Sequence, residues 1–198
     1  MSIEGMMERA VELREKGLST REICQELHLG QSTVEWLLAK QASEPEDRPP
    51  ADVKAGWRSI GVSGLRMRAI AEIMADVILE EQAQHGFEVD VIAGVMANGV
   101  PLGTMLSDIL EIDFAMVRPS REDTAIDFAS NYAGLDGKQV IIVDDVISTG
   151  STSREVIEFV KQEGGKPVLV MVLINKRAEN EVDGVPLRAL VRARPVGT

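Results

Sequence analysis

The sequence predicts an α/β domain, built on a mainly parallel sheet flanked by helices, behind a small helical module. Three observations favour this class. After about residue 57, short apolar runs alternate with segments of helical periodicity, as in parallel sheets with helical crossovers. Before residue 42 the periodicity is helical throughout. Between them, "QASEPEDRPPADVKA" holds three prolines and four carboxylates, a composition typical of a linker. We therefore predict a helical module at 1–42, a linker at 43–56 and an α/β domain at 57–198.

The helical module contains two Ser-x-x-Glu patterns, Ser19 with Glu22 and Ser32 with Glu35. In each pair the two residues can cap a helix start reciprocally. The stretch "LHLG" between the two helices is short enough to fix a sharp turn, and it places His28 where a positive φ is needed. Over about twenty residues the module resembles a helix-turn-helix. Its expected core residues are Ile23, Leu27, Leu29, Val34 and Leu37.

If the module is a helix-turn-helix, its second helix presents Gln31, Ser32 and Thr33 outward, and such side chains suit base edges and phosphates. The charge pattern opposes this reading. Residues 1–40 hold seven glutamates against five lysines and arginines, so the basic footprint of a DNA-binding surface is missing. A packing or dimerisation module is the alternative. We retain DNA binding through Gln31, Ser32 and Thr33 as the leading hypothesis.

In the α/β domain, strands and helices alternate along the chain. A helix is expected from about Leu65 to Gln84 with Ser63 as its cap, and another begins near Pro101, where a first-turn proline is tolerated. A third helix should run from about Thr152 to Glu163. The expected strands are Asp90–Val95, Asp113–Arg118, Lys138–Val143, Pro167–Asn175 and a last short one at 185–193.

Composition limits the classes of function. The net charge of −11 means that any DNA contact must be local. Cys24 is the only cysteine, which excludes an intrachain disulfide and fits a reducing compartment. The N-terminal segment is charged, unlike a signal peptide, and the apolar run "PVLVMVLI" is too short to span a bilayer. We expect a cytoplasmic protein that has no membrane partner.

The stretch "VIIVDDVISTGST" (140–152) carries the clearest chemistry. Asp144 and Asp145 stand side by side after four apolar residues, and like charges there need compensation from a ligand. Glycine and hydroxyl residues follow where a strand meets a helix, a turn that favours phosphate. The expected phosphate-binding residues are Ser148, Thr149, Gly150, Ser151 and Thr152. Carboxylates beside a phosphate cradle suit the vicinal hydroxyls of a ribose 5-phosphate, although an ordinary Asp-capped turn is the alternative.

At every position this stretch resembles the phosphoribosyl-pyrophosphate signature of the type I phosphoribosyltransferases. The resemblance implies their fold for 57–198, with ribose hydroxyls held by Asp144 and Asp145 and the 5′-phosphate held by Ser148–Thr152. It also implies that Mg²⁺ is bound only together with the pyrophosphate of the ligand, and we assign no metal-binding residues.

The segment "GVMANGVPLGTML" is similar to the pyrophosphate loop of that family, which makes Ala97, Asn98 and Gly99 further ligand-binding candidates. Order and spacing are most similar to orotate phosphoribosyltransferases, with two departures. Those enzymes have a lysine where this chain has Asn98. Their lysine-rich catalytic loop corresponds here to "RPSREDTAIDFAS", which has no lysine and offers only Arg118 and Arg121 as catalytic candidates. Arginine does not replace a catalytic lysine conservatively.

The order of the two parts resembles a group of archaeal regulators, the orotate-phosphoribosyltransferase-like transcriptional regulators, which are associated with sugar catabolism. The resemblance implies a homodimer that binds an operator and senses phosphoribosyl pyrophosphate or a related phosphorylated ribose. The alternative is an active orotate or purine phosphoribosyltransferase whose N-terminal helices assist assembly.

Overall fold

The computed structural model describes residues 3–39, 53–119 and 127–194. The chain divides into two compact units, Met1–Gly56 with Ala193–Thr198, and Trp57–Arg192. Each unit is described by itself. Most of the predicted linker lies outside the described residues, and the described part, 53–56, forms neither helix nor strand.

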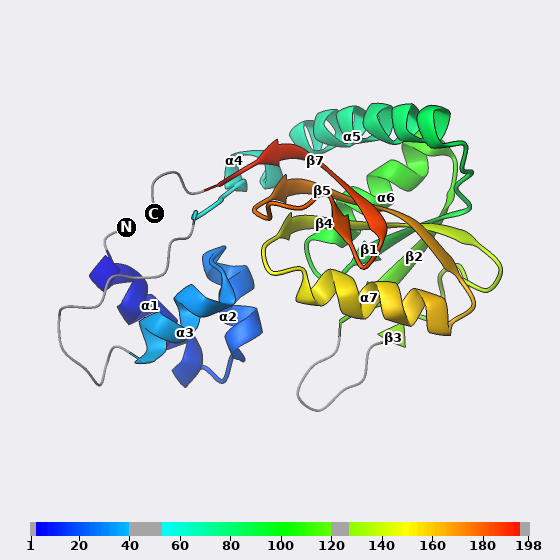
Figure 1. Ribbon diagram of the computed structural model, residues 1–198. Coiled ribbons are helices and arrows are strands. Elements are labelled where there is room, and N and C mark those ends of the chain that lie inside the picture. The colour runs from blue at the N-terminus through cyan, green and yellow to red at the C-terminus, as the bar shows by residue number, and fades with distance from the viewer. Residues whose placement is uncertain (1–2, 40–52, 120–126, 195–198) are drawn as a thin grey trace. The chain divides into compact units, whose positions relative to one another are not determined.

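The N-terminal unit consists of α1 (Ile3–Glu15), α2 (Thr20–Leu27) and α3 (Gln31–Ala39), labelled in Figure 1. The predicted helical character is confirmed. The three helices close around one apolar cluster, which includes all five residues that were predicted as its core. Its buried members are Ala10, Leu13, Ile23, Leu27, Leu29, Val34 and Leu37.

The start of α2 has the predicted capping box. The Glu22 amide donates to Ser19 Oγ at 3.3 Å, and the Ser19 amide donates to Glu22 Oε2 at 3.0 Å. His28 ends the helix with φ 55°, so the histidine adopts the predicted positive φ. The second predicted box is wrong: α3 begins at Gln31, which places Ser32 inside the first turn instead of ahead of it.

The predicted α/β class is confirmed for Trp57–Arg192. In chain order, the elements are α4 (Arg58–Gly61), α5 (Gly64–His85), β1 (Val91–Val95), α6 (Gly99–Leu110), β2 (Asp113–Arg118), β3 (Asp127–Phe128), β4 (Gln139–Ile147), α7 (Ser151–Gln162), β5 (Lys166–Asn175), β6 (Glu181–Val182) and β7 (Val185–Arg192). The longer helices α5, α6 and α7 closely match those expected from the sequence, whereas the short α4 was not predicted. Ser63 accepts a hydrogen bond from the Arg66 amide at the predicted cap of α5.

The strand order in the described sheet is β3-β2-β1-β4-β5-β7-β6. The five strands in the middle run parallel, and the two-residue strands at the edges, β3 and β6, pair antiparallel. Neither edge strand was predicted, because two residues carry no periodicity. The chain adds β2 on one side of β1 and β4 on the other, so the order reverses between β1 and β4.

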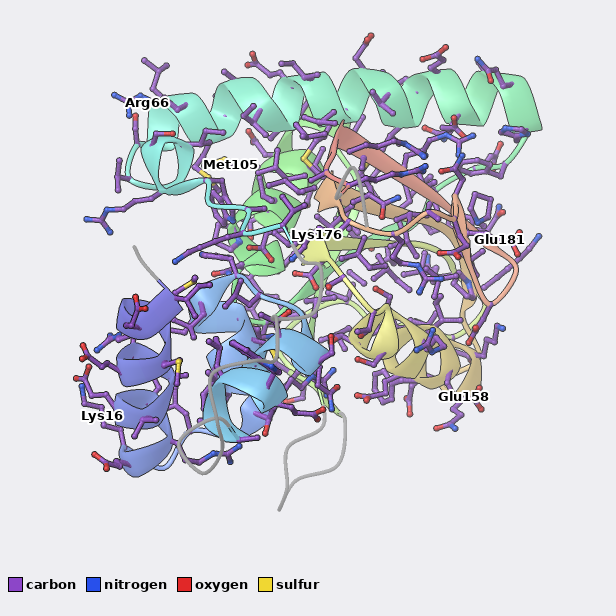
Figure 2. All side chains as sticks on the ribbon, turned by 60° about the vertical axis from the view of Figure 1, so that its left-hand side comes forward. Lys16, Arg66, Met105, Glu158, Lys176 and Glu181 are labelled. Atoms are coloured by element: carbon purple, nitrogen blue, oxygen red, sulfur yellow. The ribbon has the colours of Figure 1, made fainter. Side chains whose placement is uncertain are left out.

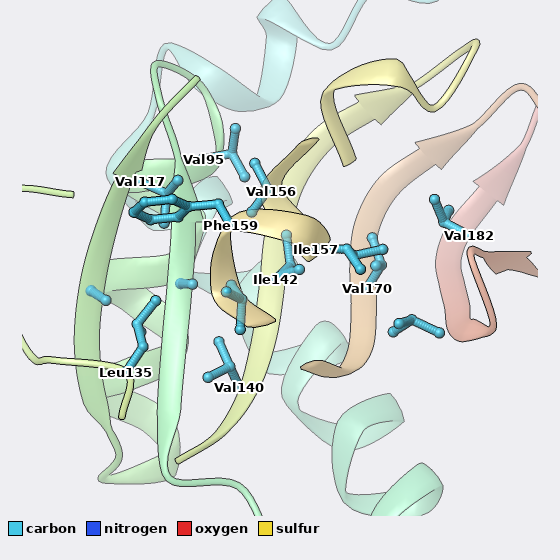
Figure 3. Close-up of a cluster of buried hydrophobic side chains, with 14 of the residues drawn as sticks. Val95, Val117, Leu135, Val140, Ile142, Val156, Ile157, Phe159, Val170 and Val182 are labelled. Atoms are coloured by element: carbon cyan, nitrogen blue, oxygen red, sulfur yellow. The ribbon is translucent and has the colours of Figure 1, made fainter. Parts of the chain in front are cut away.

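Helices cover both faces of this sheet: α5 and α6 lie on one face and α7 on the other (Figure 1). Successive side chains of a strand point to opposite faces, and β4 shows this alternation. Val140 and Ile142 pack in the α7 cluster seen in Figure 3, whereas Ile141 and Val143 pack with α5 and α6. Charged side chains lie on the outer surfaces, for example Glu158 on α7 (Figure 2).

The end of strand β4 differs from the predicted end, and this difference affects the candidate site. The predicted strand ends at Val143, but β4 continues to Ile147 and contains both adjacent aspartates. The reason is a longer neighbour: Val146 and Ile147 pair with Ile174 and Asn175 of the ten-residue β5. Asp144 and Asp145 are therefore held by the sheet ladder.

Candidate functional site

The order reversal between β1 and β4 predicts where a ligand binds. In open α/β sheets, ligands occupy the crevice outside the carboxyl ends of the strands at such a switch point. The two strands are parallel neighbours, with Val91 opposite Val140 and Gly94 opposite Val143. The loops that follow them contain the two segments predicted to bind ligand, 97–99 and 148–152. The topology therefore brings both segments to the carboxyl-terminal ends of the central strands.

The loop after β1 is held against β4 by a close backbone approach at Gly99. A Cβ atom on this buried glycine would lie 2.2 Å from the carbonyl oxygen of Val143 and 3.0 Å from the Cα of Asp144. Only glycine fits there. The loop contains a cis peptide bond between Met96 and Ala97, and Ala97 is exposed. Gly99 is also the first residue of α6, so the helix starts directly beside the aspartates.

The two aspartates have different surroundings. Asp145 is 7% exposed, and its Oδ2 accepts two hydrogen bonds, one from Asn98 Nδ2 at 3.0 Å and one from Trp57 Nε1 at 2.7 Å. Asp144 is half-buried, and its Oδ1 accepts the backbone N–H of Asp145 at 2.8 Å. Hydrogen bonds to a carboxylate stabilise its charged form. The donors that compensate Asp145 come from the protein itself, which the sequence did not indicate.

The turn between β4 and α7 places a glycine and several hydroxyl side chains at the start of a helix. Gly150 is the N-cap of α7 with φ 79°, and it provides no capping side chain. Thr149 Oγ1 lies 3.1 Å from Ser151 Oγ and accepts the Ser151 amide at 3.3 Å. Thr149 is exposed, whereas Ser148, Ser151 and Thr152 are half-buried. Hydroxyl groups thus gather where the helix dipole favours negative charge.

Two arginines near this turn were missed by the sequence reasoning. Arg177 Nη1 donates to the Thr149 carbonyl at 2.7 Å, and a Cβ on Gly150 would lie 2.1 Å from the same nitrogen. The same hypothetical Cβ would lie 3.6 Å from Arg154 Nη1. Arg177 follows β5 and stands 28 residues from Thr149, so only the pairing of β4 with β5 reveals the contact. Both guanidinium groups add positive charge beside the turn.

The catalytic candidates are placed less completely. Arg118 is the exposed last residue of β2, so it lies on the same side of the sheet as the carboxyl-terminal ends of β1 and β4. No described contact joins it to the aspartates. Arg121 lies outside the described residues.

On α3, two of the three DNA-binding candidates are exposed, namely Gln31 and Ser32. The Gln31 amide donates to Glu35 Oε1 at 2.7 Å along the same helix face. The predicted outward orientation of Thr33 is wrong: its side chain is only 7% exposed. Thr33 is buried, as are Val34 and Leu37 on the same helix, and its hydroxyl has no hydrogen-bond partner among the described residues.

Comparison with known proteins agrees with this geometry. Residues 56–187 match the model of the phosphoribosyl transferase domain family. Over its whole length the chain is similar to proteins named transcriptional regulator GfcR. The relative from Thermoplasma acidophilum is 46% identical, covering 99% of this chain and 98% of its own. The one from Picrophilus torridus is 42% identical, covering 96% and 97%.

Solved structures share the fold. An adenine phosphoribosyltransferase from Thermoanaerobacter pseudethanolicus has a TM-score of 0.57 at 22% identity, covering 74% of this chain and 91% of its own. An orotate phosphoribosyltransferase from Aeropyrum pernix has a TM-score of 0.56 at 24% identity, covering 73% and 81%. The chain, with its N-terminal helices ahead of this fold, belongs to the family of archaeal GfcR transcriptional regulators that carry a phosphoribosyl transferase domain.

Proposed function

We propose that this transcriptional regulator binds operator DNA through its N-terminal unit and senses phosphoribosyl pyrophosphate, or a related phosphorylated ribose, through Trp57–Arg192. The observation that carries the proposal is the meeting of two loops at one switch point. Gly99 brings the first loop against Val143 and Asp144, and β4 leads directly from these residues into the Gly150 turn. Carboxylates and an anion-binding turn thus lie within one short stretch of chain. Control of sugar catabolism from the cytoplasm is the physiological setting that we propose.

The phosphate end of the ligand is assigned to residues 148–152. Backbone amides and hydroxyl groups at the start of α7 suit a 5′-phosphate, whose charge the helix dipole favours. Arg177 holds the Thr149 carbonyl and adds charge beside the turn. The absence of a Cβ at Gly150 lets this guanidinium pack against the backbone.

The ribose end is assigned to Asp144 and Asp145, whose carboxylates can accept hydrogen bonds from vicinal hydroxyls. Among the described residues, no three potential metal-ligating side chains of His, Cys, Asp or Glu come together. We propose that a magnesium ion would be bound only together with the ligand, through oxygens of its pyrophosphate, since Mg²⁺ commonly binds through substrate phosphates. Such an ion would neutralise the phosphate charge beside an acidic chain.

The DNA-binding role is assigned to Gln31 and Ser32, which remain exposed on α3. With little positive charge, one module would bind DNA weakly, because phosphate neutralisation supplies most non-specific affinity. A dimer would present two recognition helices to two half-sites. Among the described residues, α5 carries exposed apolar side chains, with Leu65 81% and Ile73 52% exposed at two-turn spacing. We assign this α5 face to the homodimer, and Leu65→Asp with Ile73→Asp should give a monomer in analytical ultracentrifugation.

The test of the ligand assignment is a calorimetric titration with phosphoribosyl pyrophosphate and Mg²⁺. The wild-type chain should bind, and Asp144→Asn with Asp145→Asn should reduce the affinity at least tenfold, about 1.4 kcal/mol. Asp113→Asn is the matched control, because this exposed aspartate begins β2, at the strand ends opposite the proposed site. Equal affinity of the double variant and the control would overturn the assignment.

A further inference from the structure

Trp57 makes a contact that the proposed function does not explain. Its indole Nε1 donates to Asp145 Oδ2 at 2.7 Å across 88 residues of sequence. The same oxygen also accepts Asn98 Nδ2 at 3.0 Å. An oxygen of an ionised carboxylate offers two lone pairs. In this arrangement Oδ2 of Asp145 is fully used by the protein.

The indole ring is held in place by a local packing contact. A Cβ on Gly61 would lie 2.7 Å from Trp57 Cζ3, so the ring lies against the bare backbone at the end of α4. Trp57 and Ile60 both pack at the margin of the buried cluster beneath α5 and α6. Trp57 itself is half-buried. The donor thus comes from a small peripheral element, in contrast to Asn98, which belongs to the ligand-binding loop.

The position of Trp57 in the chain gives this contact its consequence. Trp57 is the first residue of its unit, and the unit before it ends at Gly56. The residue that donates to Asp145 is therefore also the residue at which the chain leaves toward the N-terminal module. A ligand that takes the place of the indole would therefore act on the residue at which this unit begins.

We propose that a phosphorylated ribose ligand displaces Trp57 from Asp145, and that this exchange links ligand binding to the DNA-binding unit. The inference rests on the proposed function, because it requires a ribose hydroxyl at Asp145 Oδ2, the atom that accepts the indole N–H. The exchange replaces one hydrogen bond to a charged group by another, so the indole lowers the apparent affinity for ligand. By linkage, a change in the Trp57 contact and a change in ligand affinity must be reciprocal.

The fluorescence of Trp57 provides a direct test. The sequence has two tryptophans, and Trp36→Phe leaves Trp57 as the only one in the full chain. Phosphoribosyl pyrophosphate has no aromatic ring and does not absorb the excitation light. On titration, the Trp57 emission should move to longer wavelength with the same midpoint as calorimetric binding. Binding by calorimetry without a change in Trp57 emission would overturn the displacement while leaving the ligand assignment intact.

Two variants test the competition. Trp57→Phe keeps a ring but removes the donor, and should bind phosphoribosyl pyrophosphate about tenfold more tightly than the Trp36→Phe control, the effect of one hydrogen bond to a charged group. Gly61→Ala should also increase the affinity, because its Cβ would push the Trp57 ring away from its position without removing it. Unchanged or weaker affinity in both folded variants would overturn the competition. Failure of the wild-type chain to bind the ligand at all would overturn the proposed function together with this inference.

Discussion

Main-chain geometry holds the site residues of Trp57–Arg192, whereas the N-terminal unit presents its functional candidates on an exposed helix face. At Gly99 and Gly150 a Cβ atom would clash with neighbouring atoms, so the close packing there requires glycine. Asp145 is buried and accepts hydrogen bonds from two donors. Gln31 and Ser32 are exposed, and the hydrogen bond of Gln31 to Glu35 stays on the helix surface. Substitutions of the packed glycines in the first region should therefore act through its fold, whereas substitutions on the exposed face of α3 should act only through lost contacts.

The largest effect is expected at Gly99. In Gly99→Ala the new Cβ would lie 2.2 Å from the Val143 carbonyl oxygen, so α6 or β4 must shift. Overpacking of this kind costs about 1–3 kcal/mol, and the shift should also abolish binding of phosphoribosyl pyrophosphate. Thermal unfolding and calorimetry measure the two losses. Gly134→Ala is the matched control, because nothing lies within 4 Å of its Cβ position. Equal melting temperatures would show that the loop is not held by this approach.

The next prediction concerns catalysis at the same site. Orotate enzymes have a lysine where this chain has Asn98, and Asn98 here donates to Asp145. Transfer from phosphoribosyl pyrophosphate to orotate should therefore be far below the usual enzymatic range of about 1–1000 per second. A radiochemical assay with orotate, and with adenine in parallel, measures it. Turnover within that range would make the chain an enzyme whose N-terminal helices assist assembly.

A smaller effect is expected on α3, where substitutions of exposed side chains should weaken operator binding and substitution of a buried one should not. Gln31→Ala and Ser32→Ala should each weaken binding to the specific operator by about 1 kcal/mol or more, the range for a lost base contact. Thr33→Val should leave operator affinity unchanged and keep or raise the melting temperature, because it removes a buried hydroxyl without a described partner. Fluorescence anisotropy with labelled operator measures the affinities. If only Thr33→Val lost operator affinity, the DNA contact would belong to Thr33 and not to Gln31 and Ser32.

The smallest effect is expected on α1. Hydrogen bonds from Lys16 and Arg9 lower the pKa of Glu12 to about 2. A lowered pKa stabilises the folded state above the ordinary pKa, and the contribution disappears as pH falls toward about 2. The melting-temperature difference between wild type and Glu12→Gln should therefore persist at pH 4 but shrink with added salt, since the group is exposed. Glu15→Gln on the same helix is the control. A difference that vanishes already at pH 5 would contradict the lowered pKa.

The sequence predicts the α/β class, the positions of the main elements and the segments that meet at the switch point, because periodicity and strand-turn-helix chemistry are local. It also predicts the positive φ of His28 and the capping box of Ser19. The burial of Thr33 required the exact register of α3, which starts one residue before the expected serine cap. The donors from Trp57 and Arg177 come from distant segments and leave no local pattern.

The most direct measurement of the central claim is operator affinity of the full chain with and without phosphoribosyl pyrophosphate and Mg²⁺. For the wild-type chain the ligand should change operator affinity by about 5-fold or more, the lower end of ordinary allosteric coupling. For Asp144→Asn with Asp145→Asn the ligand should leave it unchanged, and operator affinity without ligand should remain near that of the Asp113→Asn control. An equal ligand effect in the double variant, or no ligand effect in the wild type, would contradict the account.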